Sequence, residues 1–428
     1  MTLPALPGRP HLHYNNEQLS MEGVDLVSLA QKHGTPLFVY SQQAMLDALA
    51  DYQAGFAGRN ALICYAMKAN SSLAILQTFA QAGCGFDIVS AGELERALRA
   101  GAAPKNIIFS GVGKTATEMQ RALEVGIGCF NVESEAELNL LNQVAMRMGA
   151  VAPVSLRVNP DVDAKTHPYI STGLKGNKFG IAHDHALAAY SMASALPGLR
   201  VVGIDCHIGS QITEPGPFLD AMDRVLDLIG QIEAQGIQLE HIDFGGGLGI
   251  EYHGDTPPSA ESVWQQLLAK IDARGYGQRK IVIEPGRSLV GNAGVCITQA
   301  LYFKPTESKN FLIVDAAMND LPRPAMYEAY HTVVPLKPRA ERGVLMDIVG
   351  PVCESGDWLA RDRTLAVQAG DFLAVCSAGA YCMSMASNYN SRGRAAEVMV
   401  RGTAHQIIRQ RESVEDQLRQ ERALTLKP

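Results

Sequence analysis

Short apolar runs alternate with longer segments of helical character between about residue 60 and about residue 290. Eight of these runs are bounded by polar or turn-forming residues and have the length of buried strands. They occupy residues 61–67, 84–90, 106–111, 128–134, 154–160, 201–210, 241–247 and 280–286. Most of the segments between them are long enough for a helix. Eight strand–helix repeats predict an α/β fold, a (β/α)8 barrel, and the alternative is an open doubly wound sheet.

Two of the predicted helices have clear start signals. Residues 90–93 (Ser-Ala-Gly-Glu) and residues 134–137 (Ser-Glu-Ala-Glu) each place a serine three positions before a glutamate, directly after a predicted strand. This spacing is typical of a capping box, in which each side chain bonds the backbone N–H of the other residue. Apolar positions then recur on one face of the first helix, at Ala91, Leu94, Ala97 and Leu98.

The pattern changes after about residue 290, where strands follow one another with little room for helices. The candidate strands are 294–303, 311–318, 331–338, 343–352, 371–381 and 396–410. They predict a mostly antiparallel β domain. The β-like run at 37–40 precedes the barrel, so we expect a discontinuous β domain (1–41 and 291–428) beside a barrel domain (42–290). Residues 413–424 are polar and predict a short surface helix.

Composition excludes several classes of function. The 428 residues carry a net charge of −7, from 37 basic and 44 acidic side chains, which argues against a nucleic-acid or anionic-membrane partner. The first residues do not resemble a signal peptide, and no apolar stretch is long enough to span a bilayer. None of the eight cysteines forms a C-x-x-C pair, so we expect neither a metal nor disulfides, but reduced thiols in a cytoplasmic enzyme.

Polar residues that could take part in catalysis or binding lie where the predicted barrel strands end. They are Lys68, Asp87, Asn159, His207, the glycine run from Gly245 and Glu284. In a barrel, catalytic groups collect at this end, so the residues predict one shared site. Lys68 directly follows a buried strand, and partial desolvation there would lower the pKa of its amine and make it nucleophilic. The alternative is a lysine that reaches out to solvent.

The glycine run at 245–249 (Gly-Gly-Gly-Leu-Gly) follows the seventh predicted strand. Consecutive glycines allow backbone N–H groups to approach an anion, and barrels often bind phosphate at this position. The alternative is a tight turn. Ile250 stands where a dinucleotide-binding fingerprint needs its third glycine. Residues 111–115 (Gly-Val-Gly-Lys-Thr) imitate a P-loop, but Ile108 replaces the first glycine, so we discount that motif.

Other candidates each have a structural alternative. Glu284 is followed by Pro285 and Gly286, which turn the chain and aim the carboxylate at the barrel mouth; the alternative is an ion pair with Arg287. His207 could be a satisfied rim residue, and Ser210 could merely cap a helix.

Candidates in the second domain are weaker. Cys353 lies among acids and turn residues, which suggests a reactive thiol rather than an inert buried one. Arg323 and Tyr327 lie in a proline-rich loop, where the arginine would suit a carboxylate but would by default be solvated.

Many short motifs in order resemble the fold-type III pyridoxal-phosphate decarboxylases, in particular the diaminopimelate decarboxylases. They are YAMKAN at 65–70, GFDIVSAGEL at 85–94, RVNPDV at 157–162, HPYISTGLKGNKFGI at 167–181, HIGSQI at 207–212, GGGLGI at 245–250, EPGR at 284–287, CESGD at 353–357 and GAY at 379–381. The resemblance covers nearly the whole chain.

The resemblance implies a role for each matching residue. Lys68 corresponds to the lysine that binds pyridoxal 5'-phosphate covalently, and His207 to the histidine that stacks on its ring. The cofactor site would further include Asp87, Ser210, Gly247, Glu284 (facing the pyridine nitrogen), Gly286, Arg287 and Tyr381. The substrate site would include Arg287, Arg323, Tyr327, Glu354 and Tyr381. Cys353 and Glu354 match a loop that completes the site from the partner subunit, which implies a homodimer.

Charge points to the substrate. Relatives that act on ornithine or arginine need an acid for the distal cation, whereas Arg323 offers a cation to a distal carboxylate. We therefore expect meso-diaminopimelate as substrate and L-lysine and CO2 as products. Lys68 or Cys353 would return the proton to carbon. The rivals are a racemase of the same fold, a non-catalytic regulator that carries the cofactor, and a sugar-phosphate aldolase. The 166–181 segment, with His167 and Lys178, has no assigned role.

Overall fold

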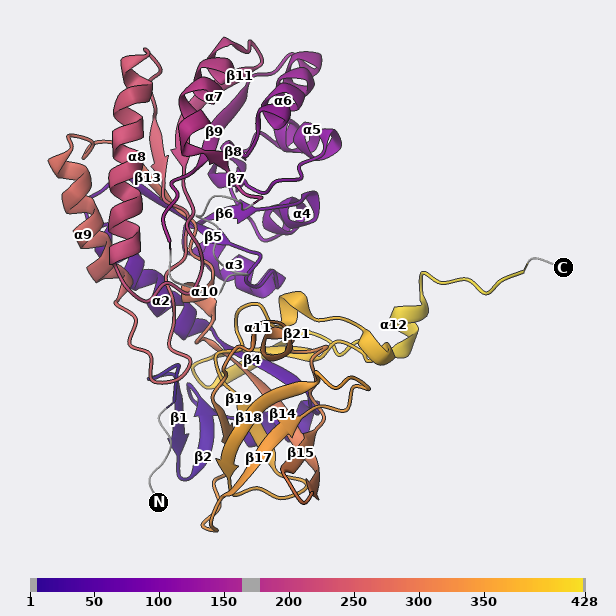
Figure 1. Cartoon of the computed structure of the whole chain (residues 1–428). Helices are drawn as coiled ribbons and strands as arrows, with labels where there is room; N and C mark the ends of the chain where they lie inside the picture. Colours follow the sequence, from indigo (N-terminus) through magenta and orange to yellow (C-terminus); the bar gives the residue numbers. More distant parts are fainter. Residues whose placement is uncertain (1–5, 164–177, 426–428) are drawn as a thin grey trace. The chain divides into compact units, whose positions relative to one another are not determined.

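The computed structural model describes residues 6–163 and 178–425, which form two compact units. The barrel unit lies within Met45–Glu251 and Asp255–Val290. The β unit contains residues 6–44, the short segment Tyr252–Gly254 and residues 291–425. Figure 1 shows the strands and helices of each unit.

Eight parallel strands close into a barrel. They are β5 (Ala61–Ala66), β6 (Gly85–Ile88), β7 (Ile107–Phe109), β8 (Cys129–Val132), β9 (Ala152–Asn159), β11 (Leu199–Asp205), β12 (His241–Asp243) and β13 (Lys280–Ile283). Each strand pairs with the next, and β13 pairs with β5 to complete the ring. The short β10 (Ile181–Ala182) adds to β9. The predicted barrel is thus confirmed over the doubly wound alternative.

All eight predicted strands exist, but several end earlier than predicted. The runs at 201–210 and 241–247 remain buried or half-buried beyond their last ladder residues, Asp205 and Asp243. Burial continues there because the following loops line the barrel mouth, so apolar character alone could not mark the strand ends. Glycines do mark one of them, since Gly245 and Gly247 have φ values of +61° and +120° that interrupt a ladder.

Helices follow the strands and surround the barrel (Figure 1). They are α2 (Gln42–Gly55), α3 (Leu73–Gln81), α4 (Ala91–Arg99), α5 (Ala116–Val125), α6 (Glu135–Met148), α7 (His183–Ala195), α8 (Gly216–Ala234), α9 (Ala260–Ala273) and the single turn α10 (Arg287–Val290). A short 3-10 turn, Pro104–Asn106, precedes β7.

The predicted capping boxes are half right. Ser90 and Ser134 accept from the backbone N–H of Glu93 and Glu137, as predicted. The glutamates, however, accept from the residue before the serine: Glu93 from Val89 at 2.7 Å and Glu137 from Glu133 at 2.9 Å. Each glutamate therefore anchors the preceding strand end to its helix.

The discounted P-loop motif has a structural role. Thr115 forms a complete capping box with Glu118 at the start of α5. Lys114 is buried, and its Nζ donates to the carbonyl groups of Gly111 and Asn131 and to Glu137 Oε1, at 2.6–2.7 Å. The lysine thus ties α5, β8 and α6 together and is satisfied within the protein.

The β unit is built on a mixed sheet in which antiparallel pairs predominate. Its strands are β4 (Leu37–Ser41), β14 (Gly294–Pro305), β15 (Asn310–Val314), β16 (Val333–Pro335), β17 (Val344–Val349), β18 (Trp358–Leu365), β19 (Phe372–Val375), β20 (Ala396–Arg401) and β21 (Ala404–Arg409). The N-terminal β4 pairs with β14 and β20, so the run at 37–40 joins this unit. A separate three-stranded sheet contains β1 (Leu12–Asn15), β2 (Gln18–Met21) and β3 (Val24–Asp25).

Three details of the β unit were not predicted. Strand β18 lies within a charged segment whose polarity concealed it. The run at 396–410 is a hairpin of two strands, with Gly402 in the turn at φ +59°. The predicted helix at 413–424 is only α12 (Val414–Leu418), while α1 (Leu26–His33) and α11 (Arg323–Tyr327) complete the helices described. Two single-turn 3-10 segments, Met383–Met385 and Tyr389–Ser391, precede β20.

The apolar core of the β unit joins the N-terminal strands to the main sheet. Leu12, Leu37 and Val39 pack with Val295 and Val398 in one buried cluster. Across the residues described, no helix combines the length and the apolar character that crossing a membrane requires.

Candidate active site

The carboxyl ends of the barrel strands carry the predicted barrel residues. Lys68 lies two residues after β5, and its Nζ forms an ion pair with the buried carboxylate of Asp87 on β6. The Lys68 side chain is 40% exposed and lies in the turn after the strand, so it is only partly desolvated, and its nucleophilic role stays a prediction. Asp87 Oδ1 has no hydrogen-bond partner among the described residues, and the same is true of Asp205 Oδ1 and Asp243 Oδ2.

His207 follows β11 and is held by the glycine loop. The backbone N–H of Gly246 donates to His207 Nδ1 at 3.1 Å, so Nδ1 is unprotonated and Nε2 carries the ring proton. Burial lowers the pKa of His207 well below its usual value, and the positive charges of Arg157 and Lys68 lower it further. The ring is therefore neutral, and a neutral aromatic face suits stacking against another ring.

The loops after β11 and β12 form a cradle that excludes side chains. A Cβ at Gly247 would lie 2.6 Å from the carbonyl oxygen of Gly209, and one at Gly246 would lie 2.3 Å from that of Glu284. Ile212 N donates to Gly247 O at 2.9 Å and fixes the two loops together. Such close backbone packing is what a phosphate-binding loop requires.

Ser210 joins this cradle to Arg287. Arg287 Nε and Nη2 donate to Ser210 Oγ at 3.2 Å and 2.9 Å. Ser210 does not cap the next helix, whose N-cap is Pro215. Gly286 lies between Glu284 and Arg287, where a Cβ would meet the Ala66 carbonyl oxygen at 3.1 Å.

Glu284 is buried and pointed into the barrel. Its Oε1 accepts from Asn131 Nδ2 at 3.1 Å and from Ser110 Oγ at 3.3 Å. These two residues come from the ends of β8 and β7, and neither was singled out from the sequence.

Two further buried acids lie beside Glu284. One carboxylate oxygen each of Asp205, Asp243 and Glu284 lie within 4.8 Å of one another. Burial raises the pKa of all three carboxyl groups. The pKa of Asp243 rises to about 6, and the charge of Asp87 adds to the effect. The pKa values of Asp205 and Glu284 rise well above their usual values, and the charge of Asp243 is the second cause for both. Like charges so close in a dry interior share protons.

Arg157 on β9 is the buried cation that partly offsets these acids. It lies 3.2 Å from Glu133 and 4.0 Å from Asp205, and its guanidinium group covers the ring of Phe179 at 5.0 Å. Burial lowers the pKa of Arg157, but Glu133 and Asp205 outweigh it and hold that pKa above the ordinary value.

Sequence reasoning missed Asp205, Asp243 and Arg157 as members of the site. A signal was present, because each is a charged residue within a run that was predicted to be a buried strand. The three carboxylates could also hold a cation, so the expected absence of a metal stays a prediction. Asn159 Oδ1 accepts from Asp161 N at 3.0 Å, which makes it a turn residue at the end of β9. His167 lies outside the described residues, and Lys178 is exposed.

The remaining predicted residues belong to the β unit. Arg323 and Tyr327 lie on α11, and Arg323 is only 6% exposed, so it is not the solvated loop arginine that we considered. Cys353 is exposed after β17, and its N–H donates to Asn390 Oδ1 at 2.8 Å. Glu354 accepts from the Tyr389 hydroxyl at 3.2 Å, and Tyr381 has a left-handed backbone, with φ +57°.

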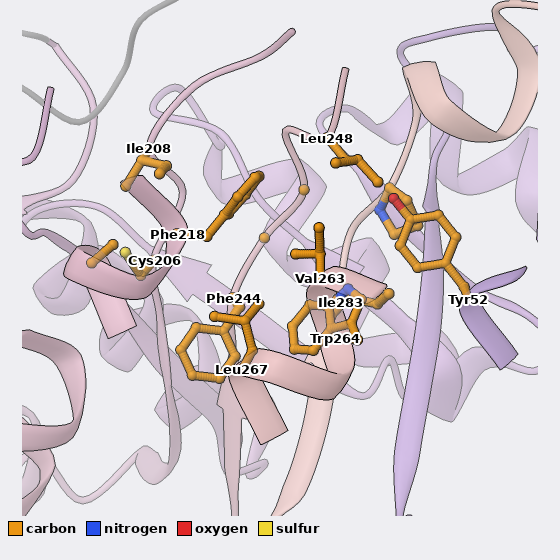
Figure 2. A pocket seen from close by; sticks show the side chains of 14 residues that line it. Tyr52, Cys206, Ile208, Phe218, Phe244, Leu248, Val263, Trp264, Leu267 and Ile283 are labelled. Carbon is orange, nitrogen blue, oxygen red and sulfur yellow. The ribbon is translucent and has the colours of Figure 1, made fainter. Parts of the chain in front are cut away.

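An apolar hollow of the barrel unit borders the glycine loop (Figure 2). It encloses about 510 Å³ of space, part of it open to solvent. Tyr52 of α2, Phe218 of α8 and Trp264 of α9 line it, together with the backbone of Gly245 and Gly246. None of the buried carboxylates reaches it, so it is separate from the charged mouth.

Comparison with known proteins identifies the family. The model of the pyridoxal-binding domain of pyridoxal-dependent decarboxylases matches residues 42–291. The chain is 53% identical to the diaminopimelate decarboxylase of Vibrio cholerae over 397 residues, which are 93% of this chain and 95% of that protein. The chain belongs to the pyridoxal-dependent decarboxylases.

Solved structures agree with this assignment. Diaminopimelate decarboxylase from Helicobacter pylori, complexed with L-lysine, superimposes with a TM-score of 0.88 at 42% identity, over 92% of this chain and 98% of that one. The M. jannaschii enzyme with L-lysine gives 0.93 at 38% identity, over 98% and 99%. Both structures share the barrel and the β domain, so the match extends beyond the cofactor-binding region.

The barrel residues fit the cofactor of a pyridoxal-dependent decarboxylase. Such a site needs an accessible amine, an anion for a ring nitrogen and a phosphate cradle. Lys68 is the amine, Glu284 the buried carboxyl group that would face the ring nitrogen, and the side-chain-free turn at Gly246 and Gly247 the cradle. The unpartnered oxygen of Asp87 is a further sign that this mouth accommodates a polar group.

Proposed function

We propose that this protein catalyses the decarboxylation of meso-2,6-diaminopimelate to L-lysine and CO2, the last step of lysine biosynthesis through diaminopimelate. One observation carries the proposal: relatives named diaminopimelate decarboxylase match nearly the whole chain at about half of its positions. A buried arginine in the β unit, Arg323, supports the same substrate because it supplies a cation for a second carboxylate.

The barrel residues divide the chemistry among them. Bound pyridoxal phosphate supplies the electron sink that decarboxylation needs. Lys68 Nζ would hold the cofactor covalently, and either Lys68 or Cys353 would supply the proton to carbon. Glu284 favours a proton on the ring nitrogen, because an adjacent anion stabilises the positive form. The neutral ring of His207 would pack against the cofactor, and the ion pair with Asp87 would orient the Lys68 amine.

The substrate residues match the charges of meso-diaminopimelate. Arg287 and Arg323 would bind the carboxylate of the end that does not react, with Tyr327 and Tyr381 beside it. Glu354 would bind the amine of that end. A fork of N–H donors binds a carboxylate through two parallel hydrogen bonds, which fixes the orientation of the substrate as well as its charge.

We further propose that the active form is a homodimer in which Cys353 and Glu354 complete the partner's site. The exposure of Cys353 after β17 supports this arrangement, because a partner could reach it. A cytoplasmic location is supported by the cysteines, all eight of which are free thiols and seven of which are buried.

An assay of CO2 release tests the substrate. Equal concentrations of meso-diaminopimelate, ornithine, arginine and lysine are supplied to the holoenzyme, and meso-diaminopimelate should react fastest. Faster turnover of ornithine would overturn the proposed substrate but not the fold. Change of configuration at carbon without CO2 would instead indicate a racemase.

Lys68→Ala tests the covalent role of the amine. The variant should lose the visible absorbance of bound pyridoxal phosphate, borohydride should no longer fix the cofactor to the protein, and kcat should fall by more than about a thousand-fold. The exposed Lys105 is the matched control, and Lys105→Ala should behave as wild type. Borohydride labelling that persists in Lys68→Ala would contradict the assignment.

A further inference from the structure

Arg323 is held by a histidine that lies outside the predicted site. His331 precedes β16 and is fully buried. Its Nε2 lies 2.8 Å from Arg323 Nη1, and its Nδ1 lies 2.8 Å from the carbonyl oxygen of Cys376. The antiparallel pairing of β16 with β19, with Val333 opposite Val375, brings His331 and Cys376 together.

The two partners determine the protonation of the His331 ring. A carbonyl oxygen can only accept, so Nδ1 carries a proton and donates it to Cys376. A guanidinium N–H can only donate, so Nε2 carries no proton and accepts from Arg323. His331 is therefore a neutral imidazole with one defined tautomer.

Tyr252 covers a face of the same guanidinium group. The Arg323 carbon Cζ lies 4.7 Å from the centre of the Tyr252 ring, and that ring meets His331 edge-on at 5.3 Å. The Tyr252 carbonyl in turn accepts from Thr332 Oγ1 at 2.8 Å. The orientation of the guanidinium plane is thus fixed by the Tyr252 ring against one face and by the acceptor His331 Nε2 at one edge.

We propose that His331 is a positioning residue that orients Arg323 to bind the distal carboxylate of the substrate. The inference rests on the proposed substrate role of Arg323. An unrestrained arginine has several rotatable bonds, and binding a carboxylate through two N–H groups requires one orientation of the fork. His331 occupies a single Nη1 donor, which leaves the other donors of the guanidinium group available for a carboxylate.

Two substitutions of His331 separate its two hydrogen bonds. In His331→Asn, the amide nitrogen replaces Nδ1 and can still donate to Cys376, but no acceptor reaches Arg323. In His331→Gln, the amide oxygen replaces Nε2 and can still accept from Arg323. We expect KM for meso-diaminopimelate to rise about ten-fold in the asparagine variant, with kcat little changed, and to stay within about three-fold in the glutamine variant.

Two inhibitors distinguish orientation of Arg323 from general damage. L-lysine keeps the distal carboxylate, whereas 1,5-diaminopentane has none. Inhibition of the holoenzyme by L-lysine should weaken about ten-fold in His331→Asn, and inhibition by 1,5-diaminopentane should not change. Equal weakening of both inhibitors, or an unchanged KM in His331→Asn, would overturn the proposal.

Arg323→Gln separates this inference from the proposed function. If Arg323→Gln leaves the preference for L-lysine over 1,5-diaminopentane intact, the carboxylate role of Arg323 is wrong. If Arg323→Gln abolishes the preference and His331→Asn preserves it, only the positioning role fails. Should His331→Asn not fold, nitrogen NMR of 15N-histidine-labelled wild-type protein decides, with His331→Gln to assign the signal. A protonated Nε2 would contradict the inference.

Discussion

At the scale of single residues, buried acids distinguish the barrel mouth. Asp205, Asp243 and Glu284 are each at most 6% exposed, and few groups of opposite charge compensate them. In water such residues would be ionised at neutral pH, but three carboxylates this close in a low-dielectric interior cannot all be charged. The cofactor-free protein therefore carries a destabilising cluster at neutral pH, and its stability should depend on protonation.

Asp243→Asn should stabilise the cofactor-free protein at high pH. The folded-state pKa of Asp243 is raised to about 6 from 3.8. Its stabilising contribution is therefore complete below about pH 4 and is lost as the pH rises through about 6. The neutral amide removes that loss, so we expect Tm to rise by about 4 °C near pH 8 and to change little near pH 4.

Thermal denaturation of the cofactor-free protein across this pH range measures the effect. Asp220→Asn is the matched control, because Asp220 is an exposed acid on α8 of the same unit and should leave Tm unchanged at both pH values. A gain for Asp243→Asn that is equal at both pH values would show that removal of charge is not the cause.

At the scale of elements, the barrel depends on ties between strand ends and helix starts. Lys114 connects the start of α5 to β8 and α6 through three hydrogen bonds. The loops after β11 and β12 are joined by the Ile212–Gly247 hydrogen bond at 2.9 Å. The first tie supports the barrel wall, whereas the second shapes the proposed phosphate cradle, so their loss should have different consequences.

Lys114→Met should destabilise the protein without altering the cofactor site. The substitution leaves the buried carboxylate of Glu137 without its cation, which costs about 3–5 kcal/mol. We expect a large fall in Tm, while the absorbance of bound pyridoxal phosphate is retained at low temperature. Lys105→Met, at an exposed position, should have no effect on Tm. A stable Lys114→Met variant would show that Glu137 is neutral in the folded protein.

Gly247→Ala should weaken cofactor binding. The added Cβ would lie 2.6 Å from the Gly209 carbonyl oxygen, at a φ of +120° that alanine rarely adopts. We expect Kd for pyridoxal phosphate, measured by absorbance titration, to rise more than about ten-fold. Gly236→Ala is the control, since Gly236 also has a positive φ but a Cβ added there would meet no atom within 4 Å. If the two substitutions raise Kd equally, the cause is the strain of alanine at a positive φ and not the clash with the Gly209 carbonyl oxygen.

At the scale of the whole molecule, the proposed dimer has a distinctive consequence. If Lys68 and Cys353 of different subunits form one site and Cys353 is the acid that returns the proton, Lys68→Ala and Cys353→Ala are each inactive alone. Co-refolded or co-expressed in equal amounts, they should regain about a quarter of wild-type activity, because half of the dimers then contain one intact site of two. Different affinity tags on the two variants, with purification over both tags in turn, confirm that mixing has occurred. Mixed dimers without recovered activity would place both residues in the same subunit's site, whereas a Cys353→Ala variant that is active alone would exclude Cys353 from the site.

The sequence predicted the strands of the barrel better than their ends and better than the strands of the β unit. The barrel and its eight strands follow from alternating apolar runs, since a strand buried on both faces must be apolar along its length. Several predicted strands extend beyond the observed strand ends, because loops that line a site are buried as well. The charged strand β18 was missed for the opposite reason, since an exposed strand need not be apolar.

The chemistry of the barrel mouth shows the same division. Lys68, Asp87, His207 and Glu284 were predicted because they end strands that must converge at one rim. By itself, the sequence determined the order of the strands, the side-chain-free glycine loop and the family, because local pattern and residue order carry that information. Only the tertiary structure decided that Glu284 lies among Asp205 and Asp243, and that His331 accepts from Arg323. Those contacts join residues distant in sequence, and burial and hydrogen-bond partners, which set protonation, exist only once the chain has folded.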